Sequence, residues 1–206
     1  MRDLVRALVS RSTSATRFRS FWSAQTTCLT RLYASPLVTV AAIRGACPAG
    51  GCILAMCCDY RIMTSDVGGA TIGLNEVALG ISVPRYWVQL YIQQLGVLRA
   101  EQSLFTGRMM TPEQALSGGL LHQLTAKAAL MAEAEKTMAT YLRNPDAGRI
   151  ATKLDARRTF AQQWQGYCSE EANNAWNSQK TRRPGAEMQP RRFGSPTSCC
   201  CFSQAR

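Results

Sequence analysis

The sequence predicts an α/β fold with a helical C-terminal part, and three observations lead to this prediction. A continuous run rich in β-branched residues at 37–43 is typical of a buried strand. A glycine-rich turn at 44–51 follows, then a short apolar helix at 52–58 and a second short strand at 60–63. After Pro84 the apolar residues recur at helical spacing for most of the remaining chain. This order of elements is that of an α/β protein.

Length and composition agree with one globular domain. The chain has 206 residues, of which 46% are hydrophobic and 18% charged. It contains no sustained heptad or Gly-X-Y repeat, so coiled-coil and collagen-like classes are excluded. No window approaches the roughly 18 consecutive apolar residues of a membrane-spanning helix, and we therefore expect no membrane partner.

The net charge of +11 belongs mostly to the two ends of the chain. Residues 1–19 hold five Arg and one Asp, and residues 180–206 hold six Lys or Arg and one Glu. The body, 20–179, is nearly neutral, with 13 basic and 11 acidic residues. Because it carries no basic stripe interleaved with aromatic residues, we expect no nucleic-acid partner.

A helix is predicted over 17–33, where apolar residues repeat at helical spacing until Ser35-Pro36 ends it. Residues 71–73 are expected to form a third short strand. In the second half, Thr111 and Pro112 have the residue types of an N-cap and first helical position. The helices expected there span 86–95, 99–106, 112 to the glycine pair 118–119, 126–142 and about 146–176.

We predict two regions, a folded domain at 1–178 and a disordered basic tail at 179–206. The tail is dominated by Pro, Arg, Gln, Ser and Gly without periodicity. The nine cysteines and the single histidine do not have the spacing of a metal site, so no metal ligand is assigned. The cysteines at 47, 52, 57 and 58 lie among apolar residues and are interpreted as reduced thiols in the core.

Two features are able to carry chemistry. The first is Ala49-Gly50-Gly51, between a buried strand and a helix, where free backbone N–H groups at the helix start can bind an oxyanion. A simple chain reversal is the alternative. The second is Glu76, a single carboxylate in an apolar segment, which is typical of a general base with a raised pKa. An exposed loop acid is the alternative there.

Residues 37–125 closely resemble the enoyl-CoA hydratase/isomerase (crotonase) superfamily, and a looser resemblance extends over 18–176. The motifs ACPAGGC, CDYRI and IGLNE look most like those of the mitochondrial-type Δ3,Δ2-enoyl-CoA isomerases. The resemblance implies a partial spiral of ββα turns and a double-bond shift from 3-enoyl-CoA to trans-2-enoyl-CoA in fatty-acid β-oxidation.

The resemblance also implies roles for individual residues. Gly50, flanked by Ala49 and Gly51, matches the glycine whose N–H binds the thioester oxygen, and Glu76 matches the only acid/base. Ile53 stands where hydratases have a second glutamate. No cofactor is expected, because the coenzyme A thioester is the substrate. A homo-oligomer, a trimer by analogy, and the mitochondrial matrix are expected, with a peroxisome or glycosome as the alternative compartment.

The sequence also departs from the family. We find no Ala-Gly-x-Asp loop for the second oxyanion donor, and we expect the chain to begin just beyond it, without three or more early strands. The basic start then corresponds to a surface helix rather than a mitochondrial presequence. We expect a poorly folded and weakly active chain. Another crotonase-type enzyme such as a hydratase, or a truncated oligomerising or binding protein without activity, remain as alternatives.

Overall fold

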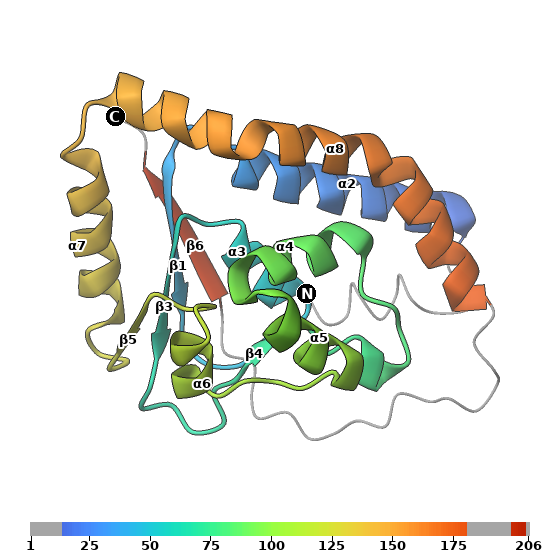
Figure 1. Cartoon of the computed structure of the whole chain (residues 1–206), viewed down its shortest axis with the longest axis horizontal. Coiled ribbons are helices and arrows are strands. Elements are labelled where there is room, and N and C mark those ends of the chain that lie inside the picture. Colours follow the sequence, from blue (N-terminus) through green and yellow to red (C-terminus); the bar gives the residue numbers. More distant parts are fainter. Residues whose placement is uncertain (1–13, 181–198, 205–206) are drawn as a thin grey trace.

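The computed structural model describes residues 14–180 and 199–204, and it shows a mixed α/β fold (Figure 1). Helices α2 and α8 run side by side along one side of the molecule, and α7 flanks the sheet. The elements in chain order are α2 (Ala15–Tyr33), β1 (Val38–Ile43), β2 (Cys47–Pro48), α3 (Gly50–Met56), β3 (Tyr60–Thr64), β4 (Ile72–Gly73), the 3₁₀ helix η1 (Val77–Leu79), α4 (Arg85–Leu95), α5 (Val97–Thr106), α6 (Pro112–Ser117), β5 (Gln123–Thr125), α7 (Leu130–Leu142), α8 (Asp146–Lys180) and β6 (Cys199–Gln204).

The larger sheet has the strand order β5-β3-β1-β6. Strand β1 pairs in parallel with β3, with Val40 opposite Tyr60, and β3 pairs in parallel with β5. All six residues of β1 are buried, because both faces of the sheet are covered. Val40 and its same-face neighbours pack on α7, whereas Ala41 and Ile43 join the main core with α3 and α4.

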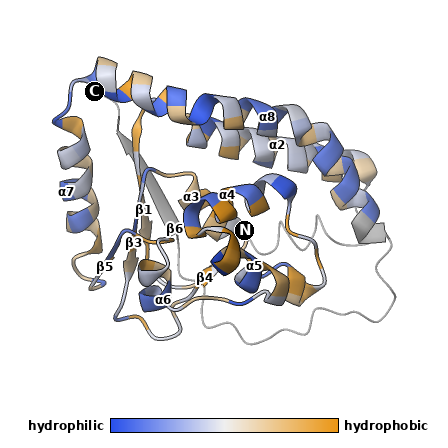
Figure 2. Ribbon diagram, viewed as in Figure 1, coloured by the Kyte–Doolittle hydropathy of each residue, from blue (hydrophilic) through white to orange (hydrophobic). Residues whose placement is uncertain are grey.

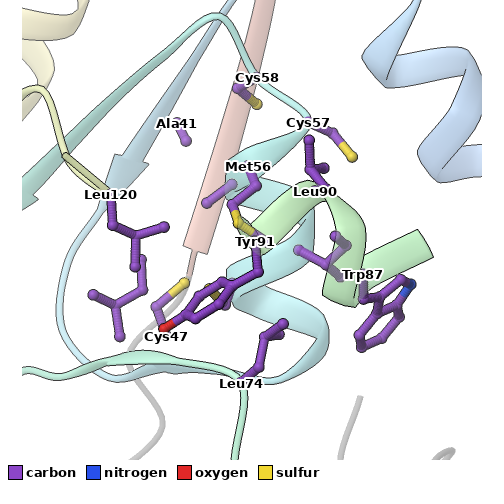
Figure 3. Close-up of a cluster of buried hydrophobic side chains, with 14 of the residues drawn as sticks. Ala41, Cys47, Met56, Cys57, Cys58, Leu74, Trp87, Leu90, Tyr91 and Leu120 are labelled. Atoms are coloured by element: carbon purple, nitrogen blue, oxygen red, sulfur yellow. The ribbon is translucent and has the colours of Figure 1, made fainter. Parts of the chain in front are cut away.

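The main core lies between α3, α4 and the sheet. Figure 2 shows hydrophobic residues concentrated in β1 and α3 and mixed with hydrophilic ones in α4, whereas much of α8 is hydrophilic. In Figure 3 the Leu90 and Tyr91 side chains reach from α4 toward α3, and Leu74 lies at the edge of the same cluster. Within residues 14–180 and 199–204, no helix combines the length and the apolar character that a bilayer-spanning segment needs.

Helix α8 is held against the sheet by a compact set of ion pairs around Asp59. Lys153 Nζ lies 2.7 Å from Asp59 Oδ2, and Arg157 Nη1 lies 2.9 Å from Asp59 Oδ1. The Arg157 guanidinium also lies over the Tyr33 ring, 4.8 Å from its centroid. Because Asp59 directly precedes β3, these contacts fix α8 relative to both the sheet and α2.

Most of the predicted elements are confirmed, and several bounds agree within two or three residues. Thr111 caps α6 in a capping box with Gln114. The predicted helix at 126–142 starts only at Leu130. Outside the predicted tail two strands were missed, β2 inside the predicted turn and β5, because strands of two or three residues carry little periodicity.

The segment predicted as a disordered tail differs from that prediction in two places. Helix α8 continues to Lys180, and Cys199–Gln204 form β6, antiparallel to β1. The physical reason is that the edge of β1 away from β3 offers backbone N–H and C=O groups, which the proline-free backbone of Cys199–Gln204 satisfies. Residues 181–198 and 205–206, and the basic segment at 1–13, lie outside the described residues.

Candidate active site

A two-stranded parallel sheet brings the two sequence-predicted site segments together. In this sheet β2 pairs with β4, with Cys47 opposite Ile72 and Pro48 opposite Gly73. The Ala49 N–H donates to the Gly73 carbonyl oxygen at 2.9 Å. The glycine turn therefore begins where β2 ends, and Glu76 follows β4 by three residues.

The turn itself has an unusual backbone. Ala49 has φ 51° and ψ −119°, and it is the one residue other than glycine with positive φ among the described residues. An L side chain rarely adopts this conformation, and strain of this kind concentrates at functional sites. Ala49 occupies the N-cap position of α3, but its methyl side chain cannot accept a hydrogen bond from the first N–H groups of that helix. The first N–H groups of α3, which begins at Gly50, are thus left without a side-chain cap.

The two glycines differ in their surroundings. A Cβ atom added to Gly51 would lie 3.3 Å from Cys47 Sγ, which is tighter than ordinary contact, so the absence of a side chain there lets α3 pack on β2. A Cβ on Gly50 would meet only Gln25 Nε2, at 3.9 Å. Gly50 is half-buried, so its backbone is not sealed inside the core.

Glu76 is buried, with 6% of its surface exposed, and it immediately precedes η1. Among the described residues neither carboxyl oxygen of Glu76 makes a hydrogen bond of standard geometry. Burial raises the pKa of Glu76 to about 7, although its own backbone N–H opposes this rise. A carboxyl group with this pKa exchanges a proton readily near neutral pH, which is what a general base requires.

The backbone of Glu76 is fixed more firmly than its side chain. Its carbonyl oxygen accepts hydrogen bonds from Leu79 at 2.9 Å and Ile81 at 3.0 Å. Helix α5 supports the same turn, because a Cβ on Gly107 would lie only 2.7 Å from Ala78 N. The sequence identified Gly107 only as a helix end, and its close contact with η1 has no signal in the local pattern.

Other buried polar groups lie near Glu76 in the chain or in the core. Asn75 is buried, and its side-chain oxygen has no partner among the described residues. Tyr91 is fully buried beside Cys47 and Leu74 (Figure 3), and burial raises its pKa, so the phenol stays neutral. Ile53, the position that the resemblance compares with a hydratase glutamate, is a fully buried core residue of α3.

The remaining candidate groups have structural roles. His122 Nδ1 accepts a hydrogen bond from the Arg61 backbone N–H at 3.1 Å, and its ring stacks on Tyr60 at 4.5 Å. Burial lowers the pKa of His122 to about 4, so it is neutral at physiological pH. Within the part of the chain that the structure describes, no group of three or more His, Cys, Asp or Glu residues is arranged to hold a metal ion.

The comparisons with known proteins agree with this geometry. The sequence profile of the family described as enoyl-CoA hydratase/isomerase matches residues 8–189. The chain therefore belongs to the enoyl-CoA hydratase/isomerase family, and the predicted crotonase-type α/β fold with a helical C-terminal part is confirmed.

Particular relatives point to one branch of that family. The chain is 38% identical over 144 residues to mitochondrial enoyl-CoA delta isomerase 1 of Mus musculus, a match that covers 70% of this chain and 50% of the relative. The human protein of the same name is 38% identical over 149 residues, which cover 72% of this chain and 49% of the relative. The chain thus spans about half the length of the curated relatives it matches.

Solved structures of the same family superpose on the chain. The structure of human mitochondrial delta3-delta2-enoyl-CoA isomerase superposes with a TM-score of 0.79 at 32% identity, over 82% of this chain and 66% of that one. An enoyl-CoA hydratase from Mycobacterium ulcerans superposes with a TM-score of 0.72 at 20% identity, over 81% and 71% of the two chains, and this likeness concerns the fold alone.

Proposed function

We propose that this protein shifts the double bond of a 3-enoyl-CoA thioester to give trans-2-enoyl-CoA, as a step of fatty-acid β-oxidation. The observation that carries the proposal is the Glu76 carboxyl group. It is buried, it makes no hydrogen bond of standard geometry among the described residues, and its pKa of about 7 lies near neutral pH. The related isomerases support the substrate class.

In the proposed reaction Glu76 takes the proton from C2 of the substrate and returns it to C4. The electron pair left at C2 delocalises into the thioester, and the negative charge collects on its oxygen. The Gly50 N–H donates to that oxygen, with Ala49 and Gly51 shaping the turn around it. One preorganised donor is worth about 3–4 kcal/mol of transition-state stabilisation, and the positioned base about 10²–10⁴ in rate. The reaction needs no cofactor, because the coenzyme A thioester is itself the substrate.

The Ile53 position favours isomerisation over hydration. Hydration needs one group to activate water and another to protonate carbon, whereas moving a double bond needs one group that does both. Ile53 is a buried core residue, so α3 brings no carboxyl group there. A hydratase is the second candidate function. A binding protein without activity is the third, because the match covers only 50% of the related isomerase.

The test is an assay of the purified chain with 3-enoyl-CoA and, in parallel, with trans-2-enoyl-CoA for hydration. We expect isomerase turnover in the wild type and a loss of about 10²–10⁴ in kcat for Glu76→Gln. Exposed Glu135→Gln is the matched control and keeps the wild-type rate. Equal rates for Glu76→Gln and wild type would remove the shuttle role, hydration without isomerisation would favour the hydratase, and no turnover of either substrate would favour the inactive binding protein.

We also propose a homo-oligomer, a trimer by analogy with the family. The exposed large hydrophobic side chains among the described residues are Val77 on η1, Val97, Leu98 and Phe105 on α5, and Leu116 on α6. Burial of exposed apolar side chains of this kind favours association between copies of the chain. Sedimentation analysis tests the state directly, and a monomer at micromolar concentration contradicts it.

The mitochondrial matrix is the proposed compartment. The names of the related isomerases support it. Fractionation of cells that produce the tagged chain tests it, and recovery with peroxisomes or glycosomes would indicate the alternative.

A further inference from the structure

Glu171 is a buried carboxyl group that the proposed reaction does not use. It lies on α8, and 5% of its surface is exposed. The indole N–H of Trp22 on α2 donates to Glu171 Oε2 at 3.4 Å. Among the described residues Oε1 has no hydrogen bond of standard geometry. Burying a carboxyl group with one oxygen that lacks a standard hydrogen bond costs free energy, so we expect groups nearby that stabilise it.

Such groups lie at the start of α4. The N-cap of α4 is Pro84, so no side chain of α4 itself caps its first N–H groups. The Pro84 carbonyl accepts from Trp87 and Val88. The backbone N–H groups of Arg85 and Tyr86, the first two residues of α4, lie near enough to Glu171 to act on its pKa. Burial raises the pKa of Glu171, and four nearby N–H groups oppose that rise: the Trp22 indole, the Tyr86 backbone, the Trp164 indole and the Arg85 backbone. Of these, the Trp22 indole makes the hydrogen bond of standard geometry to Glu171.

A stripe of aromatic residues on α8 holds the same end of α4. Phe160, Trp164 and Tyr167 precede Glu171 at helical spacing, and all three rings lie around Tyr86. Their centroids are 5.4, 6.1 and 5.7 Å from that of Tyr86. The Arg85 guanidinium lies over the Tyr167 ring, 5.2 Å from its centroid. The first two residues of α4 are therefore docked on α8, Tyr86 by ring contacts and Arg85 by a cation–π contact, and Glu171 follows the stripe by one helical turn.

We infer that Glu171 is a positioning residue that caps the N-terminus of α4 from α8 and thereby holds the segment that carries Glu76. The connection is short, because Pro84 ends a loop in which Ile81 donates to the Glu76 carbonyl oxygen at 3.0 Å. If the start of α4 frays, that loop loses its fixed end. The part of this inference that concerns turnover rests on the proposed function.

The experiment compares Glu171→Ala and Glu171→Gln with Glu170→Ala, an exposed glutamate one position earlier on the same helix. Amide hydrogen exchange followed by mass spectrometry is measured in the full chain. For Glu171→Ala we expect exchange in peptides covering 77–95 to rise about 10-fold, as loss of a helix cap predicts, with β1 and β3 unchanged. For Glu171→Gln, which keeps an acceptor oxygen, we expect most of the protection to return. Glu170→Ala behaves as wild type.

Turnover of 3-enoyl-CoA gives a second readout. We expect Glu171→Ala to lower kcat several-fold with little change in KM, and Glu171→Gln to restore it. An equal rise of exchange in β1, β3 and α4, or no rise in α4, would overturn the inference. If Glu171→Ala does not fold, Glu171→Gln decides alone. The small rise in exchange that remains after loss of the charge should be confined to 77–95, and an equal rise in β1 and β3, or no rise at all, contradicts the inference. If the wild type has no activity, the exchange result still stands and only the proposed function fails.

Discussion

The backbone N–H of Ala49 donates to the carbonyl oxygen of Gly73 at 2.9 Å. This hydrogen bond joins two segments that are 24 positions apart in the sequence. Ala49 stands at the start of the glycine turn, and Gly73 ends the strand that leads to Glu76. The bond lies at the end of the two-stranded sheet formed by β2 and β4. Gly50, the candidate oxyanion donor, and Glu76, the candidate base, follow these two paired strands.

The pH dependence of turnover should follow the ionisation of Glu76. Its pKa is about 7 because burial disfavours the charged form, and only the carboxylate accepts a proton from C2. We expect kcat/KM for 3-enoyl-CoA to rise with pH, with a midpoint near 7, and to level off above 8. A rate that is flat between pH 5 and 8 would show that another group limits the reaction.

The same burial should cost stability at neutral pH. The pKa of Glu76 is raised from 4.5 to about 7 on folding, so the folded protein binds the proton more tightly than the unfolded chain. The stability contributed by the protonated form is complete below pH 4.5 and is lost as pH rises through 7. Glu76→Gln does not titrate, so at pH 8 it should be more stable than wild type by up to about 3 kcal/mol.

Urea unfolding at pH 4.5 and pH 8 measures this difference. The advantage of Glu76→Gln should be small at the lower pH and largest at the higher one. Other groups titrate in both proteins and cancel in the comparison. A difference between the two proteins that does not change with pH contradicts the buried, shifted carboxyl group.

Gly107 should tolerate a side chain less well than Gly80. Both have left-handed backbones, with φ of 63° and 69°, so alanine is strained at either position by about 1 kcal/mol. At Gly107 the added Cβ would also lie 2.7 Å from Ala78 N, whereas at Gly80 it meets nothing within 4 Å. We expect Gly107→Ala to lose about 1–3 kcal/mol more than Gly80→Ala.

Thermal or urea unfolding of the two variants checks this expectation. Gly80→Ala serves as the control for the left-handed backbone alone. Equal losses would mean that α5 and η1 separate at little cost, and the contact between them would then not fix the Glu76 segment.

Ala49→Gly should stabilise the fold. Ala49 has φ 51° and ψ −119°, a conformation that glycine adopts readily and alanine does not. Relief of this strain outweighs the extra freedom of glycine in the unfolded chain, and we expect a gain of about 1 kcal/mol. Ala34→Gly is the contrasting control, since Ala34 has φ −94° and glycine should lower stability there. A loss at both positions would show that the turn is not strained.

The sequence alone determined the local structure and the candidate residues. The buried strand at 38–43, the Thr111 cap and the helix ends at glycine follow from residue types and spacing, because each depends on neighbours within a few positions. Glu76 and the turn around Gly50 were likewise identifiable as single features, and the family resemblance linked them.

Only the tertiary structure decided how these features meet. Strand β2 has two residues and no pattern of its own, so its pairing with β4 depends on the backbone hydrogen bonds that the surrounding core brings into register. The contact of Gly107 with Ala78 and the approach of Glu171 to the start of α4 each join segments far apart in sequence. Spacing along the chain records local periodicity, whereas the burial that shifts the pKa of Glu76 exists only when distant elements exclude water together.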